Sequence, residues 1–258
     1  MTVLLPPSET KRDGGDETRP FDLGALSFPE LTGERVAVIT AARSVSSDDA
    51  TARAALKLGP KSLAERHRNL TLEGAPTLPA IDRYTGVLYD PLDAVGADPA
   101  TRAWWAAHVV VQSAMFGPVG GGDPLPAYRL SHDSRLGVVR LATTWAGPSA
   151  RVIAARSGGG LVLDLRSEGY RALGPVEDAV TLRVVSQDAD GRRRALNHWN
   201  KTAKGRLVAA LGAARPDVSD MATLVEWART VGIVVDRVDG VWELVAESLG
   251  SAAGTASD

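Results

Sequence analysis

The chain has 258 residues, of which 44% are apolar and 23% are charged, and its formal net charge is −2. These proportions are ordinary for a folded globular protein, and a charge so close to zero leaves only a local basic patch for any contact with nucleic acid. Cysteine is absent, which excludes disulfides and cysteine-ligated metal sites. No secretory signal is found, and no apolar run approaches the ~20 residues that span a bilayer. We therefore expect a soluble cytoplasmic protein without a membrane partner.

The first half of the chain predicts short strands and helices in alternation. Residues 2–5 form an apolar strand, which Pro6 and Pro7 end because proline cannot donate to a β-ladder. A polar, mobile loop is expected at 12–24, and a helix starts at Pro29. The run "ERVAVITAARS" (34–44) fits either a strand, through its β-branched residues, or a continuation of that helix. The remaining expected elements are two short helices within 48–72, a helix at 99–107 and a buried strand within 108–117.

The second half predicts the rest of a mixed sheet. The glycine-rich stretch "GPVGGGDPLPAYRL" (117–130) lacks the Lys-Ser/Thr of a phosphate loop, so we interpret it as a flexible connection. Apolar runs predict interior strands at 161–165 and 180–186, and Asp239-Gly240 is typical of the turn of a hairpin. Helices are expected at 147–157, 201–212 and 220–231. The prediction is an α/β fold, a mixed sheet flanked by helices, in one compact domain over residues 1–247 with a disordered tail at 248–258.

Polar side chains follow several of the predicted strands at the points where they end. Because ligands of open α/β sheets bind outside the carboxyl ends of the strands, we expect these side chains to line one cleft. The groups concerned are Ser8, Glu9, Thr10 and Lys11; Gln112 and Ser113; Tyr128 and Arg129; and Arg166, Ser167, Glu168 and Tyr170.

The strongest local feature is the basic segment "GRRRALNHWNKTAKGR" (191–206). Lys201 and Lys204 fall in the first turn of the predicted helix, where positive charge opposes the helix dipole unless an anion binds there. The segment therefore favours a phosphate-contacting patch, and the alternative is a solvated basic face. The candidate contacts are Arg192, Arg193, Arg194, Trp199, Lys201, Lys204 and Arg206.

Other candidate residues also have structural alternatives. Tyr84 and Tyr89 are explained equally well as residues that cover the edge of the core. Glu168 could serve as a general acid or base, or could cap a helix that starts near Gly169. Ser113 could satisfy backbone groups where its strand ends.

The order of motifs resembles the YaaA peroxide-stress protein family, over residues 2 to about 246. A strand runs into a Ser/Pro turn in "LLPPSETK", a Tyr-x-Gly segment follows at Tyr84-Thr85-Gly86, and "SAMFG" leads to "PAYRL". Further along the chain come "LVLDLRSEGY", "NKTAKG" and a closing helix and hairpin in "VEWARTVGIVVDRVDGVWELV". Ser131 and His132 stand where family members often carry an acidic residue.

The resemblance implies a helix for the run after Pro29 and one α/β fold with a basic cleft. It also implies a helix-hairpin-helix-like element, which would fall on "PTLPAIDRYTGVLYDP" (76–91). The family role it implies is cytoplasmic: binding DNA and limiting oxidative damage during hydrogen peroxide stress, partly through lower free iron.

Two functions follow as hypotheses. In the first, the protein binds DNA without sequence specificity, through phosphate contacts and stacking by Trp199 or Tyr84. The second is an enzyme acting on a small phosphorylated or nucleoside-like ligand in the same cleft. The anion-binding candidates are Lys11, Arg129, Lys201, Lys204, Arg206, Arg192, Arg193, Arg194 and Trp199, and the catalytic candidates are Glu168, Tyr170 and Ser8.

Metal chemistry has little support in the sequence. The four histidines show no HExxH motif or i, i+4 spacing, so we expect neither a metal site nor a cofactor. Iron handling by Glu9, Asp164 and Glu168 is the weaker third hypothesis.

Overall fold

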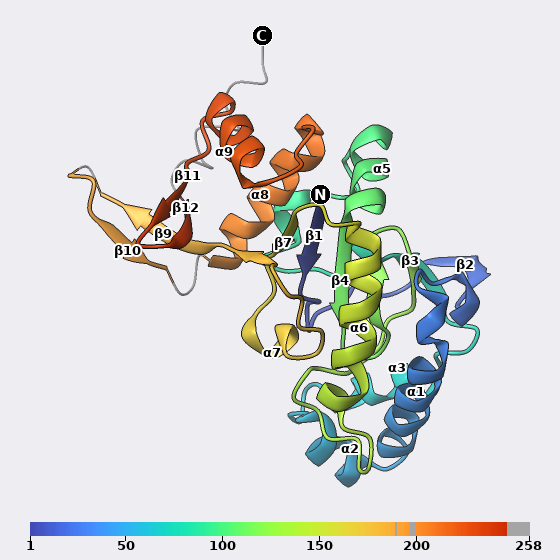
Figure 1. The fold of residues 1–258 in the computed structure, drawn as a ribbon. Helices are drawn as coiled ribbons and strands as arrows, with labels where there is room; N and C mark the ends of the chain where they lie inside the picture. The colour runs from blue at the N-terminus through green and yellow to red at the C-terminus, as the bar shows by residue number, and fades with distance from the viewer. Residues whose placement is uncertain (189, 197–199, 247–258) are drawn as a thin grey trace.

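The computed structural model describes residues 1–188, 190–196 and 200–246, and it has a central five-stranded sheet flanked by helices (Figure 1). The strand order is β5-β4-β1-β7-β8, in which β1, β4, β7 and β8 are parallel and β5 is antiparallel to β4. The bounds are β1 Thr2–Leu5, β4 Val109–Ser113, β5 Gly117–Gly120, β7 Val162–Asp164 and β8 Val180–Thr181. The prediction of a mixed α/β sheet is confirmed.

The middle strands read as continuous apolar runs because both faces of the sheet are covered. All residues of β1 and β4 are buried, and Leu4 is paired with Val110 on one side and Asp164 on the other. Asp164 is thus a carboxylate at the buried end of an interior strand, which requires a compensating charge.

Helices cover both sides of this sheet and supply most of the remaining core. The run 34–44 is helical, as the resemblance implies, because it continues the helix that begins after a 3-10 turn at Pro29. The predicted helix at 147–157 begins six residues earlier than expected, at Leu141. The bounds are η1 Leu23–Ala25, η2 Pro29–Leu31, α1 Thr32–Ser46, α2 Asp49–Leu56, η3 Leu63–Arg66, α3 His67–Leu70, α5 Pro99–His108, α6 Leu141–Ser157, α7 Glu168–Arg171, α8 Asn200–Ala214 and α9 Met221–Thr230.

A second sheet projects from the body of the protein (left side of Figure 1). Its order is β10-β9-β12-β11, with bounds β9 Arg183–Gln187, β10 Arg193–Ala195, β11 Val235–Val238 and β12 Val241–Val245. The hairpin turn at Asp239-Gly240 is confirmed, since both residues have the positive φ that such a turn requires. The single strand predicted at 180–186 is wrong: the chain leaves β8 at Leu182 and enters the second sheet as β9. The arginine run 192–194 is carried outward with it.

A third, smaller sheet and the edge strand β5 of the central sheet together overturn two loop predictions. The third sheet has the order β2-β3-β6, with bounds β2 Asp16–Pro20, β3 Pro76–Pro79 and β6 Pro124–Leu125. Part of the loop expected at 12–24 is therefore a strand. The flexible connection predicted at 117–130 is also wrong, because it contains the strands β5, which is fully buried, and β6.

The glycines of that stretch are there for close packing rather than for flexibility. A Cβ on Gly121 would lie 2.7 Å from the carbonyl oxygen of Trp105, and one on Gly117, whose φ is +67°, would lie 2.6 Å from the Trp145 ring. A sequence pattern that is typical of loops here marks positions where only glycine fits.

The segment expected to form a helix-hairpin-helix-like element, residues 76–91, consists of β3, the one-turn helix α4 (Ala80–Arg83) and a 3-10 turn, η4 (Asp90–Leu92). Its Arg83 is fully buried and donates to four backbone carbonyl groups. Tyr84 and Tyr89 are buried as well, which confirms the core interpretation of both tyrosines. A DNA-binding role for this segment stays a prediction.

In the ranges described, helices that are both long and apolar enough to cross a membrane are absent. The proposed tail at 248–258 lies outside the described residues, so the domain boundary at 247 stays a prediction.

Candidate functional site

A pocket of about 330 Å³ opens at the carboxyl edge of the parallel strands, and we call it the sheet-edge pocket. Its lining comes from the turn after β1, the segment after α4, the loop before α6, and the start of α7 and α8. Its lining residues are Pro6, Pro7, Ser8, Glu9, Thr10, Thr85, Val87, Leu88, Tyr89, Ser131, His132, Ser167, Tyr170 and Lys201. A larger hollow of about 1060 Å³ lies near the start of β7, between α6 and the beginning of α9, and none of the sequence-predicted site residues lines it.

The pocket joins some of the predicted strand ends and leaves others out. Ser8 follows β1 and Tyr170 follows β7, and both line the pocket together with Lys201. At the end of β4, Ser113 does not reach the pocket: its Oγ accepts the backbone N–H groups of Met115 and Phe116. Its structural interpretation is therefore confirmed.

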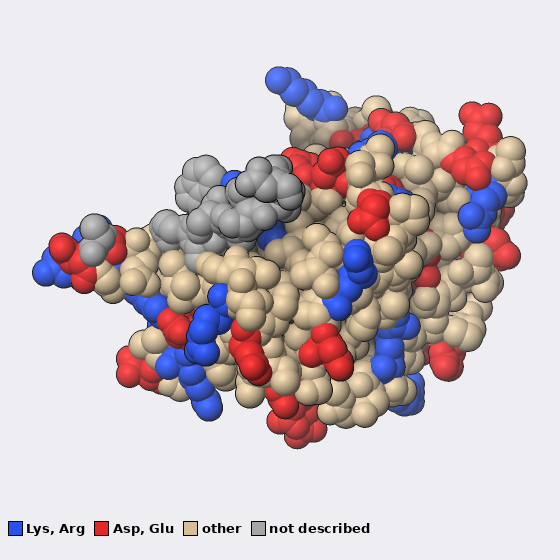
Figure 2. All heavy atoms as spheres, turned by 90° about the horizontal axis from the view of Figure 1, so that it is seen from above, with Lys and Arg blue, Asp and Glu red and all other residues tan. Residues whose placement is uncertain are grey.

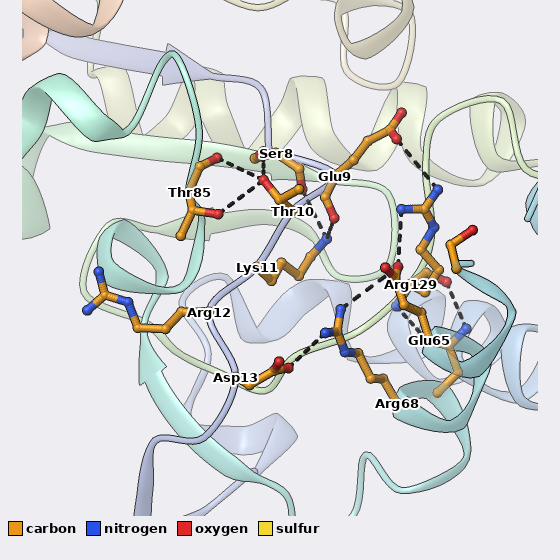
Figure 3. Close-up of polar contacts among 12 residues, drawn as sticks. Ser8, Glu9, Thr10, Lys11, Arg12, Asp13, Glu65, Arg68, Thr85 and Arg129 are labelled. Carbon is orange, nitrogen blue, oxygen red and sulfur yellow. Dashed lines mark hydrogen bonds and ion pairs between the residues drawn. The ribbon is translucent and has the colours of Figure 1, made fainter. Parts of the chain in front are cut away.

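Three hydroxyl groups gather on one wall of the pocket (Figure 3). Ser8 and Thr10 share a hydrogen bond of 3.1 Å, and the Thr85 hydroxyl donates to Thr10 Oγ1 at 3.0 Å. Gly86 lies beside them with a φ of +95°, a backbone conformation that favours glycine. Hydroxyl groups can turn their protons toward a bound oxygen atom, so this wall can donate to a ligand.

Lys201 is the exposed cation of the pocket, in the first turn of α8. It has no ion-pair partner in the part of the chain that the structure describes. Lys204 is half-buried one turn later, and its Nζ donates to the carbonyl oxygen of Leu165 at 3.3 Å. Burial lowers the pKa of Lys204, while the charge of Asp164 opposes the decrease. The first turn thus presents one ammonium group to the pocket and directs the other toward the end of β7.

Lys11, expected to contact an anion, is turned away from solvent and is only 7% exposed. Its Nζ donates to the carbonyl oxygens of Ser8 at 3.0 Å and Glu9 at 3.3 Å, and it lies 4.2 Å from the centre of the Tyr128 ring. Burial, with the nearby charges of Arg129 and Arg68, lowers the pKa of Lys11 to about 7.

Arg129 is already paired with carboxylates, which weakens its predicted role as an anion holder. Its guanidinium group lies 3.3 Å from Glu65 and 3.5 Å from Glu9, beside the turn after β1 (Figure 3). Only 14% of its side chain is exposed, and it does not line the pocket. An anion would have to displace Glu65 or Glu9 to reach it.

Beneath the pocket the tyrosines form a buried hydrogen-bonded chain. The hydroxyls of Tyr84 and Tyr128 are 2.8 Å apart, and Tyr128 is 2.8 Å from Ser113 Oγ. Burial raises the pKa of both phenols well above the ordinary value, and it does the same for Tyr170. These phenols stay neutral at physiological pH and act as hydrogen-bonding groups.

A buried ion pair braces the end of β7 beside the pocket. Arg166 donates to Asp164 through Nε at 2.9 Å and Nη2 at 2.6 Å, and through Nη1 to Gln112 at 3.3 Å. The side chains of Asp164 and Arg166 are 3% and 0% exposed. The pair explains how an interior strand tolerates Asp164, and it fixes the chain just before Ser167 enters the pocket wall.

The predicted general acid or base, Glu168, is the exposed first residue of α7 and is not among the residues that line the pocket. The titratable side chains that do line it, besides Lys201 and the tyrosines, are Glu9 and His132. His132 contacts the Tyr170 ring edge-on at 4.9 Å between centroids. Sequence reasoning missed His132, although its departure from the family pattern pointed to it. Folding brings it against Gly169, where a Cβ would lie 2.6 Å from the imidazole.

The predicted basic segment 191–206 does not form one patch on this pocket. Arg193 is paired with Asp236 and with Glu243, whereas Arg192 and Arg194 are exposed on the projecting sheet. Arg206 is exposed on α8, and Trp199 lies outside the described residues. On the face seen from above, basic and acidic side chains are interspersed (Figure 2). Folding thus places Arg192, Arg193 and Arg194 on the projecting sheet and Arg206 on α8 with Lys201 and Lys204, and a shared phosphate-contacting patch stays a prediction.

Within residues 1–188, 190–196 and 200–246, no group of three or more histidine or carboxylate side chains could hold a metal ion. Of the three carboxylates considered for iron, Asp164 is paired with Arg166 and Glu9 with Arg129.

The fold and site define a class: an α/β protein with a mixed sheet and a small polar pocket at the carboxyl edge of its parallel strands. The family model described as peroxide stress protein YaaA matches residues 1–230, so the chain belongs to that family. It is similar to a UPF0246 protein of Corynebacterium efficiens, at 40% identity over 93% of this chain and 96% of the relative. A UPF0246 protein of Corynebacterium glutamicum is 36% identical (92% and 95% covered), and one of Streptomyces coelicolor is 37% identical (92% of each).

Proposed function

We propose that the protein acts in the cytoplasm in the defence against hydrogen peroxide, and that it binds a small anionic ligand in the sheet-edge pocket. The observation that carries the proposal is that one concave site collects Ser8, Tyr170 and Lys201 from distant parts of the chain. The pocket volume of about 330 Å³ falls within the range of small-molecule sites. The family supports the link to peroxide stress.

The lining indicates what the ligand looks like. Lys201 and the hydroxyls of Ser8, Thr10 and Thr85 suit a phosphate, sulfate or carboxylate group, since each can donate a hydrogen bond to an anionic oxygen. Tyr89, Leu88 and Val87 offer apolar and aromatic surface on the next wall. A small phosphorylated or nucleoside-like molecule combines both features.

Acid–base chemistry on such a ligand would be assigned to Glu9 or His132, because these titratable groups line the pocket. Glu168 is exposed and does not line the pocket. Its role as the general acid or base stays a prediction, which Glu168→Gln would test once a substrate is found: unchanged turnover would remove Glu168 from the mechanism.

Removing the pocket ammonium should weaken anion binding strongly. We expect Lys201→Met to raise the Kd for sulfate by about tenfold or more, since a hydrogen bond to a charged group contributes about 1.5–3 kcal/mol. Calorimetric titration of both proteins at fixed ionic strength measures the change. Lys61→Met is the matched control, because Lys61 is exposed and does not line the pocket. Equal loss in both variants, or none in either, would contradict the proposal.

Nonspecific DNA binding is the second candidate, and the exposure of Arg192, Arg194, Lys201 and Arg206 favours it. It predicts that the logarithm of the DNA affinity falls steeply with the logarithm of the salt concentration, and that Arg192→Ala with Arg194→Ala reduces the slope by about two. A duplex or single strand that binds no better than a neutral polymer at low salt would eliminate this candidate. The limitation of oxidative DNA damage through a lower concentration of free iron, which the family resemblance implies, would be part of this second candidate function.

A further inference from the structure

Lys11 occupies an unusual environment for a lysine. Its ammonium nitrogen donates to the carbonyl oxygens of Ser8 and Glu9 (Figure 3). It also lies 4.2 Å from the centre of the Tyr128 ring and 5.6 Å from that of Tyr84. In the portion of the chain that the structure describes, it forms no ion pair with a carboxylate. An uncharged amine has two N–H groups, so it can donate both of these hydrogen bonds to the carbonyl oxygens, as an ammonium group can.

The charges that face Lys11 come from several elements and act in opposite directions. Arg129 follows β6 and Arg68 lies in α3, and both oppose a positive charge on Lys11. Glu65 in η3 and Glu9 in the turn after β1 favour that charge, although both are also bound to Arg129. Tyr84 and Tyr128 are buried and neutral. Burial has the largest effect on the pKa of Lys11, and together with the charges of Arg129 and Arg68 it lowers that pKa to about 7.

The composition of the chain makes the choice of lysine here informative. Only five lysines, Lys11, Lys57, Lys61, Lys201 and Lys204, accompany 24 arginines. Three of the five meet at the carboxyl edge of the sheet, and burial lowers the pKa of two of these three. Lysine, unlike arginine, can give up its proton when buried.

Lys11 is coupled to the sheet-edge pocket through the turn after β1. The carbonyl groups that hold its Nζ belong to Ser8 and Glu9, and both of these residues line the pocket. A unit negative charge in the pocket would favour protonation of the amine, by a factor of roughly thirty if it lay about 8 Å from Nζ in a medium with an effective dielectric constant of about 20.

We propose that the sheet-edge pocket binds its anion together with a proton, and that Lys11 is the group that takes up this proton. The inference rests on the proposed function, since it requires an anion in the pocket. Binding then strengthens as the pH falls through neutrality, and release of the ligand returns a proton to solvent. The site would thus include an amine, next to the turn that lines the pocket, whose protonation changes within the physiological pH range.

One neighbouring group could give a similar pH dependence and must be separated from Lys11. His132 lines the pocket itself, and imidazole is the side chain that ordinarily changes charge between pH 5 and 8. The experiment therefore needs a variant at each position.

Sulfate is the probe, because it stays a dianion from pH 6 to pH 9 whereas phosphate does not. Calorimetric titrations at constant ionic strength should give a Kd that rises tenfold or more between pH 6 and pH 9 in the native protein. Repeating the titration at pH 7 in buffers with different ionisation enthalpies should show net proton uptake. Lys11→Met should remove the pH dependence, and His132→Asn should retain it.

The opposite pattern, with the pH dependence kept in Lys11→Met and lost in His132→Asn, would overturn the proposal. The native protein offers a second measurement that does not depend on the folding of a variant. With only five lysines, ¹³C-labelled lysine gives few side-chain Cε signals, and that of Lys11 should titrate near pH 7 and at a higher pH in saturating sulfate. Titration near the ordinary lysine value in both conditions would also overturn the proposal. Failure of sulfate to bind at any pH would contradict the proposed function, whereas binding that is independent of pH would contradict only the proton linkage.

Discussion

Replacing Asp164 by alanine is expected to lower the free energy of unfolding by about 3–5 kcal/mol. The change leaves the fully buried guanidinium group of Arg166 without its carboxylate, and only the Gln112 amide oxygen would still accept from it. Denaturant unfolding of the native and variant proteins measures the difference, which corresponds to roughly 10 °C in Tm for a chain of this size.

The matched control is the exposed pair between Arg43 and Glu73, whose nitrogen and oxygen are 2.8 Å apart and whose side chains are 40% and 85% exposed. Glu73→Ala should cost less than about 1 kcal/mol, because solvent screens such pairs. Replacing Asp164 by alanine and Arg166 by methionine together should cost less than the two single changes summed. A loss for Asp164→Ala as small as that for Glu73→Ala would contradict the assignment of a buried ion pair at the end of β7.

Adding one methyl group at Gly205 should both destabilise the protein and impair the pocket. A Cβ at this position of α8 would lie 2.1 Å from the carbonyl oxygen of Leu88 and 3.3 Å from Pro91, so the helix must move away from η4. We expect Gly205→Ala to cost about 1–3 kcal/mol. Because α8 carries Lys201 and Leu88 lines the pocket, sulfate binding should weaken by about tenfold as well, as expected when a charged hydrogen bond is lost.

Gly33→Ala is the control for the added methyl group. Gly33 is exposed in the first turn of α1, and a Cβ at this position would have no neighbouring atom within 4 Å. Alanine there should leave sulfate binding unchanged and stabilise the helix by up to about 1 kcal/mol. Measurements of sulfate affinity and of thermal unfolding should therefore show a decrease in both for Gly205→Ala and a decrease in neither for Gly33→Ala. Unaltered stability and sulfate affinity in Gly205→Ala would show that α8 does not depend on this close approach.

Much of the fold could be predicted, because its interior strands are short apolar runs with clear ends. Residues 2–5 and 161–165 were recognisable as buried strands, and Asp239-Gly240 as the turn of a hairpin. The stretch 117–130 could not be predicted, since glycines that serve close packing look the same in sequence as glycines that serve flexibility. Whether a Cβ fits depends on Trp105 and Trp145, which are brought there only by folding.

The candidate site was predicted in part, for a similar reason. Parallel strands end at one edge of a sheet, and this rule correctly placed Ser8 and Tyr170 near each other. Lysine and arginine were treated alike as anion contacts, yet Lys11 is buried behind the pocket and Arg129 is occupied by two carboxylates. The partners of a charged side chain come from other segments, so its availability is not visible in its own sequence neighbourhood.

The basic segment 191–206 shows that the position of a charged side chain, like its partners, could not be predicted from the neighbouring sequence. Arg193 and Lys201 are close in the chain, but one belongs to a projecting sheet and the other to a helix on the pocket. The chain passes from the central sheet to the projecting sheet between β8 and β9, and the strand-like stretch 180–186, with a single charged residue at Arg183, gave no clear sign of this change.

Diffraction from crystals soaked in selenate would show whether the sheet-edge pocket is an anion site, because the anomalous signal of selenium locates the ion. We expect a peak inside the pocket, within hydrogen-bonding distance of Lys201 and of at least one of the hydroxyls of Ser8, Thr10 and Thr85. Peaks confined to Arg192, Arg194 and Arg206, with none in the pocket, would contradict the claim and favour a surface that binds nucleic acid.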